Sequence, residues 1–339
     1  MKDYSNILII KMSSLGDVIH ALPTLYALRQ NLPHAKITWA IHEQFASLLP
    51  GTPWVDEVIV IDKKQLKSPS YLWNLRKELH SRHFDMTLDL QCIAKSAIVS
   101  LLSGSPEKYG YWELREGSQL VNKALVGAHK YDHVIERYLD TVRALGGEVD
   151  GVEFPMPHDH AAEGKIRNRL SELGVTDDYV VVVPGARWIV KEWPLLNFGE
   201  LCIRLCESGK KVVIAGSPDD SEKGQFIENY VKSDNLINLV GQTTMAELIE
   251  LIRHCHIFIS ADTGPLHIAN ALKKPLIALF GTTSPHRTGP YGGSHVHLII
   301  SPTSKATPEQ PLVDDLDCMA QIPVDAVWDV YSEMLRKDL

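Results

Sequence analysis

Short apolar segments alternate with helical patterns along most of this 339-residue chain. In the first half, the pattern predicts strands at residues 6–12, 36–42, 57–62 and 86–90, and helices at 18–31, 73–82, 93–102 and 133–145. Near-continuous apolar strands separated by helices are typical of parallel sheets that helices cover on both faces. The sequence therefore predicts an α/β fold. Residues 104–130 show no regular pattern and are expected to be irregular.

The alternation begins again in the second half, after a segment rich in Gly, Pro, Asp and His at 147–160 that we interpret as a linker. Predicted strands lie at 179–183, 211–215, 236–240, 257–260 and 276–280, and predicted helices at 161–173, 195–207, 221–231, 245–254 and 266–272. We expect Rossmann-like domains at 1–155 and 156–339, with a ligand cleft at the facing carboxyl ends of their strands. A last helix at 324–336 is expected to pack back on the first domain.

Composition excludes several classes of protein. The first 150 residues hold 17 Lys and Arg and 17 Asp and Glu, so the net charge of −8 belongs to the remainder, which argues against nucleic-acid binding. No apolar run approaches the roughly 20 residues that span a bilayer, and residues 7–10 are too few for a signal peptide. A cytoplasmic protein is expected. Five cysteines without a C-x-x-C motif predict neither a zinc site nor disulfides.

The segment 63–82 is locally basic, with six Lys or Arg against one Glu, and Tyr71, Leu72, Trp73 and Leu75 lie among them. Basic and aromatic residues together can contact an anionic membrane surface. A solvated helix with a few buried apolar side chains explains the same pattern, and both interpretations stay open.

The loop after the first predicted strand reads Lys11-Met12-Ser13-Ser14-Leu15-Gly16-Asp17 and leads into a helix. Gly16 permits a tight turn, and Asp17 then stands near a helix N-terminus. Asp17 is either a capping residue or a general base that takes a proton from a hydroxyl.

A second motif of this kind, Asp262-Thr263-Gly264-Pro265-Leu266-His267, follows a strand of the second half. Pro265 suits a first helical turn, and the amides at Thr263 and Gly264 could hold a phosphate. Asp262 could accept hydrogen bonds from sugar hydroxyls, and His267 is expected at the same end of the helix. A capped helix with a partly buried histidine is the alternative.

Three further loops follow strands of the second half. Residues 184–194 hold a Gly-rich turn with Arg187 and Lys191, which suits a pyrophosphate. Asp220 follows the next strand and either holds a ribose or caps a helix, and Thr243 and Thr244 either line a base or cap a helix. G-x-G-x-x-G after a first strand, the Walker loop, H-E-x-x-H and G-x-S-x-G are all missing from the sequence, which disfavours a dinucleotide-dependent oxidoreductase.

In combination these motifs resemble glycosyltransferase family 9, the lipopolysaccharide core heptosyltransferases, and most closely the heptosyltransferase I type. The resemblance rests on residues 11–23, Gly185-Ala186-Arg187, Lys191-Glu192-Trp193-Pro194, the 262–267 motif and Phe280-Gly281-Thr282-Thr283. It implies a GT-B fold and an inverting displacement, without metal or cofactor, that moves L-glycero-D-manno-heptose from ADP-heptose to a Kdo hydroxyl of Kdo-lipid A. It also implies peripheral attachment to the cytoplasmic face of the inner membrane.

The resemblance also assigns roles to residues. Asp17 is the expected base, Lys191 with the Thr263 and Gly264 amides binds the donor diphosphate, and Asp262 and His267 contact donor sugar and phosphate. The remaining expected donor contacts are Ala186, Arg187, Asp220, Thr243 and Thr244, and the remaining expected acceptor contacts are Ser14, Gly16, Lys95 and Arg115. Some family members carry Thr-Thr where this chain has Ala186-Arg187. The alternatives are another family 9 transferase, such as a heptosyltransferase II or one using a different nucleotide-sugar, a nucleotide-binding regulatory protein, or an oxidoreductase.

Overall fold

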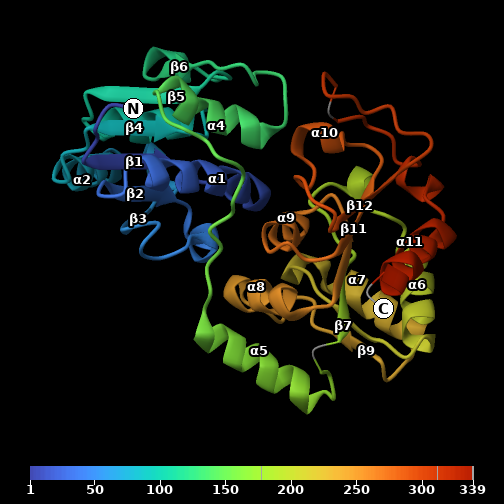
Figure 1. The fold of residues 1–339 in the computed structure, drawn as a ribbon. Helices are drawn as coiled ribbons and strands as arrows, with labels where there is room; N and C mark the ends of the chain where they lie inside the picture. The colour runs from blue at the N-terminus through green and yellow to red at the C-terminus, as the bar shows by residue number, and fades with distance from the viewer. Residues whose placement is uncertain (177, 311, 338–339) are drawn as a thin grey trace. The chain divides into compact units, whose positions relative to one another are not determined.

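The computed structural model describes residues 1–176, 178–310 and 312–337. These residues form two six-stranded parallel sheets, each with helices on its faces (Figure 1). The chain divides into one compact unit at Met1–Pro157 and a second that begins at His158.

The first unit has the strand order β3-β2-β1-β4-β5-β6, with every neighbouring pair parallel. The strands are β1 (Asn6–Ile10), β2 (Lys36–Ile41), β3 (Glu57–Val60), β4 (Met86–Asp89), β5 (Glu107–Tyr111) and β6 (Lys123–Leu125). The α-helices are α1 (Leu15–Asn31), α2 (Pro69–His80), α3 (Ala94–Leu102) and α4 (Val134–Ala144).

The second unit has the order β12-β11-β10-β7-β8-β9, again parallel throughout. Its strands are β7 (Tyr179–Val183), β8 (Lys211–Ile214), β9 (Leu236–Asn238), β10 (Ile257–Ala261), β11 (Leu276–Phe280) and β12 (Val296–Ile300). Its α-helices are α5 (His160–Glu172), α6 (Leu195–Glu207), α7 (Ser221–Val231), α8 (Met245–His254), α9 (Gly264–Ala271), α10 (Pro285–Thr288) and α11 (Val324–Lys337).

Both sheets follow the Rossmann strand order, because the chain runs outward from the first strand of each unit and then returns to add strands on its other side. The direction reverses between β1 and β4 in the first unit and between β7 and β10 in the second. Loops at the carboxyl ends of such a central pair diverge and leave room for a ligand. The 11–17 and 262–267 motifs follow β1 and β10, so each stands at one of these reversals.

One expectation about the first unit was wrong. Residues 104–130 are not irregular, because β5 and β6 lie within them. Strand β5 has the sequence EKYGY, in which the first three residues are only half-buried, and β6 has three residues. The outermost strand of the second sheet, β12, was also not expected, since its side chains are half-buried or exposed. Strands without a continuous apolar face do not produce the pattern that reveals buried parallel strands.

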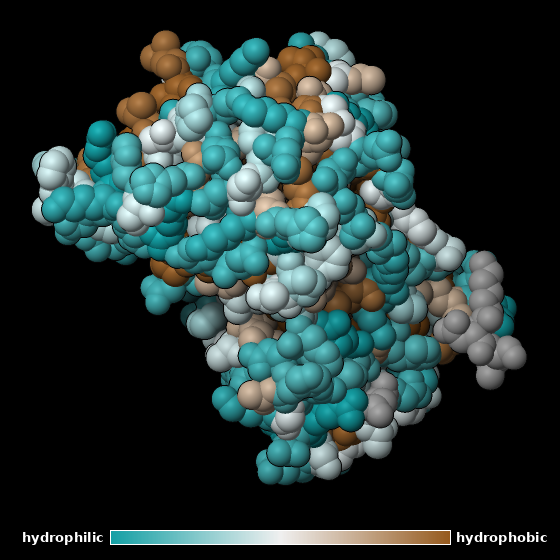
Figure 2. All heavy atoms as spheres, turned by 60° about the vertical axis from the view of Figure 1, so that its left-hand side comes forward, coloured by the Kyte–Doolittle hydropathy of each residue, from teal (hydrophilic) through white to brown (hydrophobic). Residues whose placement is uncertain are grey.

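The face in Figure 2 is mostly hydrophilic, with separate hydrophobic patches. In the first unit the exposed large apolar residues include Trp73, Leu120 and Tyr131. Within the described residues, no helix combines the length and apolarity needed to cross a membrane.

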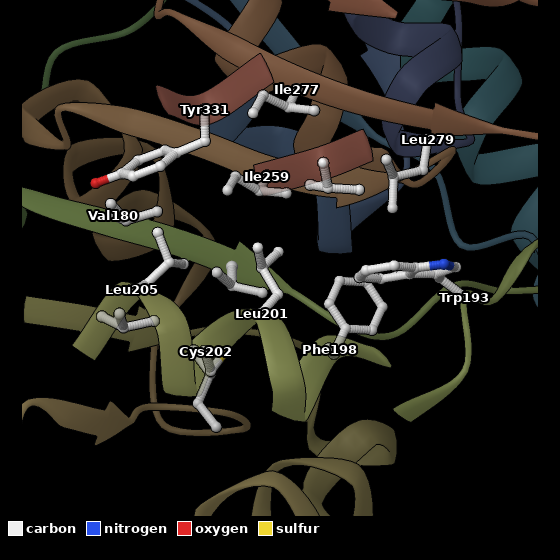
Figure 3. Packing of buried hydrophobic residues seen from close by; sticks show 14 of the residues in the cluster. Val180, Trp193, Phe198, Leu201, Cys202, Leu205, Ile259, Ile277, Leu279 and Tyr331 are labelled. Atoms are coloured by element: carbon white, nitrogen blue, oxygen red, sulfur yellow. The ribbon is translucent and has the colours of Figure 1, made fainter. Parts of the chain in front are cut away.

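The core of the second unit lies between its sheet and the helices α6 and α11. Phe198, Leu201 and Leu205 of α6 face the strands, and Tyr331 of α11 lies over them (Figure 3). Each such fully buried apolar side chain contributes about 1.5–3 kcal/mol to the free energy of unfolding. The apolar face of α11 is therefore covered by its own unit, where Val327 and Met334 join the same core.

Trp193 links α6 to the segment just before α11 and provides a test of this core. Its buried indole Nε1 donates to the Ile322 carbonyl oxygen at 3.0 Å, and its ring meets Phe198 edge-on at 4.9 Å. We expect Trp193→Ala to lower the free energy of unfolding of the second unit by about 3–5 kcal/mol, because it leaves a cavity. Trp193→Phe should cost about 1–3 kcal/mol, mainly through the unpaired carbonyl oxygen.

Urea denaturation followed by far-UV circular dichroism measures both changes. Trp73→Phe is the matched control, because Trp73 is 59% exposed and its replacement should change the free energy of unfolding by less than about 0.5 kcal/mol. Equal midpoints for wild type and Trp193→Ala would contradict this account of the core.

Candidate active site

Lys11 is a buried cation at the carboxyl end of β1. Its Nζ donates to the Leu90 carbonyl oxygen at 3.0 Å and to the Tyr138 hydroxyl at 2.7 Å, and it lies over the Tyr138 ring. Burial, with the Asp17 charge as the second cause, raises the pKa of Tyr138 well above its usual value. The phenol therefore stays neutral beside the lysine, and Lys11 ties β1 to the end of β4 and to α4.

Asp17 caps helix α1 and also faces Lys11. Its Oδ2 accepts from the backbone N–H of Ser14 at 2.9 Å and from the Ser14 hydroxyl at 2.7 Å. Its Oδ1 lies 4.0 Å from Lys11 Nζ, and the side chain is 42% exposed. Gly16 is the second residue of the same helix. Asp17 is thus a capping residue by geometry. Its carboxylate is still reached by solvent and lies next to the positive charge of Lys11.

Gln91 fixes the backbone of the loop between Lys11 and Ser14. Its side-chain Oε1 accepts from the N–H groups of Met12 and Ser13, both at 3.1 Å. This contact crosses the chain reversal between β1 and β4. The loop in front of Asp17 is therefore held from the neighbouring strand.

Asp89, the last residue of β4, organises the loop that carries Gln91. Its Oδ1 accepts from the N–H groups of Gln91 and Cys92, and its Oδ2 from Ser96 Oγ and Asn122 Nδ2, all at 2.8–2.9 Å. Complete burial raises the pKa of Asp89 to about 6, although the hydrogen bonds from Cys92, Ser96 and Gln91 oppose the rise. The carboxylate is ionised at neutral pH and receives four donors.

The two expected basic acceptor contacts, Lys95 and Arg115, are both exposed. Lys95 lies in the first turn of α3, and the Arg115 N–H donates to the Cys92 carbonyl oxygen at 3.0 Å. The loops after β4 and β5 therefore meet, and both basic residues belong to this loop cluster at the carboxyl edge of the first sheet.

In the second unit, Lys191 and Asp262 form a partly buried ion pair. Lys191 Nζ lies 2.7 Å from Asp262 Oδ2, with the two side chains 19% and 8% exposed. Thr283 donates its hydroxyl to the same oxygen at 2.8 Å. Nε2 of His267 lies 3.9 Å from Asp262 Oδ1. The loops after β7, β10 and β11 thus converge on one carboxylate, and the structure brings together the lysine, aspartate and histidine that the sequence singled out.

The ion pair lies next to the amino end of α9, whose N-cap is Thr263 and whose first residue is Gly264. The first amides of a helix lack intrahelical partners, and this end carries the positive pole of the helix dipole. Lys191 and the start of α9 therefore form a locally positive position suited to an anion.

The Gly185-Ala186 turn contacts the loop after β8. The Ala186 N–H donates to Glu192 Oε1 at 3.3 Å, and Lys223 Nζ lies 2.9 Å from Asp220 Oδ1 and also binds Glu192. A Cβ on Gly185 would stand 2.1 Å from Asp220 Oδ1, so only glycine fits there. Asp220 also accepts from Ser217 at 2.6 Å, which makes it a loop-fixing residue in this structure.

The other expected donor contacts stand outside the ion-pair cluster. Arg187 is exposed, with its guanidinium 5.8 Å from the Trp188 ring. Thr244 is the N-cap of α8, where its N–H donates to Glu247 Oε2 at 2.8 Å and its hydroxyl accepts from the Glu247 N–H at 3.2 Å. Thr243 is half-buried beside it. Helix capping accounts for the contacts of Thr244.

Sequence reasoning did not assign a role to Gln91 or Thr283, or to the Glu192–Lys223 pair. Gln91 and Lys223 act by contacting loops that are distant in sequence, so no local pattern marks them. Glu192 and Thr283 do lie within motifs that carry the family resemblance, but their contacts with Lys223 and Asp262 come from other loops and cannot be read from those motifs.

A family model described as glycosyltransferase family 9 (heptosyltransferase) matches residues 72–319, which is most of the chain. The chain belongs to glycosyltransferase family 9. It is therefore a glycosyltransferase, and the two Rossmann-like sheets are the halves of its GT-B fold.

Curated relatives of this family 9 chain have similar length. It is 28% identical over 305 residues to lipopolysaccharide heptosyltransferase 1 of Pseudomonas aeruginosa, covering 86% of this chain and 83% of the relative. It is 27% identical over 338 residues to lipopolysaccharide heptosyltransferase 3 of Escherichia coli, covering 95% and 96%.

Solved structures share the fold over nearly the whole chain. A family 9 glycosyltransferase from Veillonella parvula gives a TM-score of 0.87 at 22% identity, with 99% of both chains covered. An Escherichia coli heptosyltransferase with ADP gives a TM-score of 0.77 at 24% identity, covering 97% of this chain and 99% of that one.

Asp89 generates a pH-dependent prediction. Its pKa is about 6 in the folded chain and about 3.9 when unfolded, so between these values the folded form binds more protons. The free energy of unfolding must then fall as pH rises from about 4 to about 6. Relative to Asp89→Asn, which has no such titration, wild type should lose up to about 3 kcal/mol between pH 4 and pH 7.

Urea titrations of wild type and Asp89→Asn at several pH values measure the difference between their free energies of unfolding. The titration of all other groups contributes equally to both proteins and cancels in this difference. Asp62→Asn is a control of opposite sign, because hydrogen bonds from the Gln65 side chain and the Lys64 backbone lower the pKa of the exposed Asp62. A wild-type minus Asp89→Asn difference that stays constant across this range would show that Asp89 titrates as an ordinary carboxyl group.

Proposed function

We propose that this chain transfers L-glycero-D-manno-heptose from ADP-heptose to a Kdo hydroxyl of Kdo-lipid A, as the first heptose of the lipopolysaccharide core. Family membership and relatives named lipopolysaccharide heptosyltransferases support the reaction class. The observation that carries the proposal is the partly buried Lys191–Asp262 pair beside the amino end of α9, because it offers a cation and a carboxylate that can bind hydroxyls at one point.

The donor half of the proposed mechanism uses this pair. The diphosphate of ADP-heptose carries more negative charge than Asp262, so it competes for Lys191 and for the Thr263 and Gly264 amides. Asp262, released in part from the lysine, then accepts hydrogen bonds from sugar hydroxyls, with His267 nearby. Negative charge grows on ADP as its bond to the anomeric carbon breaks, and Lys191 stabilises that charge in the transition state.

The acceptor half uses Asp17. An acceptor hydroxyl oxygen attacks the anomeric carbon from the side opposite ADP, which inverts the configuration, and its proton passes to Asp17. Lys11, 4.0 Å from Asp17, favours the ionised base. Gln91 holds the preceding amides and keeps the loop in one geometry.

The choice of the first heptose over later ones rests on the 11–17 motif, which is closer to the heptosyltransferase I type. Kdo and lipid A are anionic, and Lys95 and Arg115 are exposed cations at the same sheet edge. Transfer to a heptose already on the core, as by a heptosyltransferase II, is the second candidate, since relatives of types 1, 2 and 3 are almost equally identical to this chain.

We further propose that helix α2 rests on the inner membrane, at its cytoplasmic face, where the acceptor lipid resides. Trp73 is 59% exposed and Lys77 Nζ lies 5.3 Å from its ring centroid, so an apolar ring and a cation are presented together. This pairing favours an anionic lipid surface.

Replacing Asp17 tests the catalytic assignment. Asp17→Asn keeps an oxygen that can accept from the Ser14 N–H but removes the base, so we expect turnover to fall by about 10²–10⁴-fold with little change in ADP-heptose affinity. Glu247→Gln alters an equivalent capping carboxylate on α8 and should leave turnover near wild type. Near-normal turnover in Asp17→Asn would remove Asp17 from the mechanism.

Lys191→Met tests the donor assignment. Loss of a charged hydrogen bond to the diphosphate should weaken ADP-heptose binding by about 10- to 100-fold in calorimetry. Lys210→Met is the matched control, because Lys210 pairs with Asp178 at 2.5 Å outside the cluster. Equal weakening by both variants would point to a general effect of lost charge rather than to a diphosphate contact.

The reaction itself is tested with purified donors and acceptors. Kdo-lipid A and heptosyl-Kdo-lipid A should be compared with ADP-heptose, ADP-glucose and UDP-sugars, and the product identified by mass spectrometry. The proposal requires transfer to Kdo-lipid A. Transfer only to heptosyl-Kdo-lipid A would favour the second candidate, and thermal stabilisation by NAD alone would contradict a transferase donor site.

A further inference from the structure

Three histidines and two glutamates gather where the second unit begins, apart from the candidate active site. His158 and His160 flank Asp159, the N-cap of α5, and Glu163 lies one turn later. Glu250 and His254 come from α8, against which α5 packs. His254 ends α8, which leads into the amino end of β10, whereas Asp262 follows the carboxyl end of that strand.

Three of these side chains direct ligand atoms at one point. His158 Nε2 lies 2.9 Å and His160 Nδ1 3.5 Å from Glu163 Oε2, and the three atoms all fall within 4.8 Å of one another. Neighbouring ligands of a zinc-sized ion, each about 2.0–2.2 Å from the metal, stand at comparable separations. The two imidazole rings lie side by side, with centroids 4.3 Å apart.

The second carboxylate oxygen of Glu163 is held separately. Oε1 lies 3.0 Å from His254 Nε2 and 3.3 Å from Arg167 Nε, which leaves Oε2 toward the other two histidines. Oε2 of Glu163 is therefore available to a metal ion, while Oε1 pairs with His254 and Arg167.

The backbone beneath these ligands is fixed. Asp159 accepts from the N–H groups of Ala161 and Ala162 at 2.9 and 3.0 Å, and its own N–H donates to Glu250 Oε1 at 3.1 Å. Glu250 is 1% exposed and is paired with Arg253 at 2.7 Å. His158 and His160 thus flank Asp159, whose backbone and side chain are both fixed by hydrogen bonds. The two histidine side chains are 43% and 84% exposed, so an ion can reach them.

We propose that His158, His160 and Glu163 bind a divalent transition-metal ion of the zinc class, with water in the remaining positions. Two imidazoles and one carboxylate favour Zn²⁺, Co²⁺ or Ni²⁺ over Mg²⁺ and Ca²⁺, which prefer all-oxygen sites. The bound ion would tie His158, the first residue of the second unit, to α5. This site is independent of the transferase assignment, because none of its residues takes part in the proposed reaction.

Titration of the metal-free full chain with Zn²⁺ in a calorimeter tests the site. We expect one equivalent to bind, a rise in melting temperature, and visible absorption bands when Co²⁺ is used instead, with no heat from Mg²⁺. His160→Ala should weaken Zn²⁺ binding by at least about tenfold, since a ligand is lost. His160 is 84% exposed, so its replacement should not disturb folding.

Glu163→Gln and the double variant His158→Ala/His160→Ala extend the series, and both should abolish the Co²⁺ bands. His34→Ala, which removes an exposed histidine of the first unit, should bind Zn²⁺ as wild type does. Failure of the wild-type chain to bind Zn²⁺, Co²⁺ or Ni²⁺ would overturn the proposal. Unchanged Zn²⁺ affinity in His160→Ala and in the double variant would do the same.

Discussion

The chain reversal between the two central strands of each sheet is the constraint on which the rest of this structure depends. Parallel strands need crossovers, and because these crossovers are right-handed, reversing the direction of strand addition moves the connecting helices to the other face of the sheet. The loops after β1 and β4, and those after β7 and β10, consequently diverge above each sheet. Every residue argued to take part in transfer either follows one of these four strands or binds a residue that does.

The two units stabilise their reversals with different chemistry. In the first, a neutral amide oxygen of Gln91 binds two backbone N–H groups, and Lys11 donates to a carbonyl oxygen. In the second, the contact is an ion pair between Lys191 and Asp262. Hydrogen bonds to backbone groups suit a loop that must keep one shape, whereas the Lys191–Asp262 ion pair can exchange partners when a stronger anion arrives. The difference fits the proposal of a fixed base in one unit and an anion-binding position in the other.

Sequence alone predicted the buried elements well, because β7 and β10 are almost entirely apolar and helices such as α6 have one apolar face. It did not predict β5, β6 or β12, whose partial burial depends on neighbours distant in the chain. The same limit applies to the site. Asp17 and Asp262 could be named from local motifs, but Gln91 and Thr283 act only through contacts that the fold creates.

Net charge gives a misleading picture of the second unit. The chain beyond residue 150 carries the whole formal charge of −8, yet the position beside α9 suits an anion. Charges on the exposed surface are screened within about 8 Å at physiological ionic strength, whereas partly buried charges are screened much less. Lys191 is 19% exposed and lies at the positive end of a helix, so the local potential is set by a few buried groups. An acidic surface and the proposed diphosphate-binding position are therefore compatible in one unit.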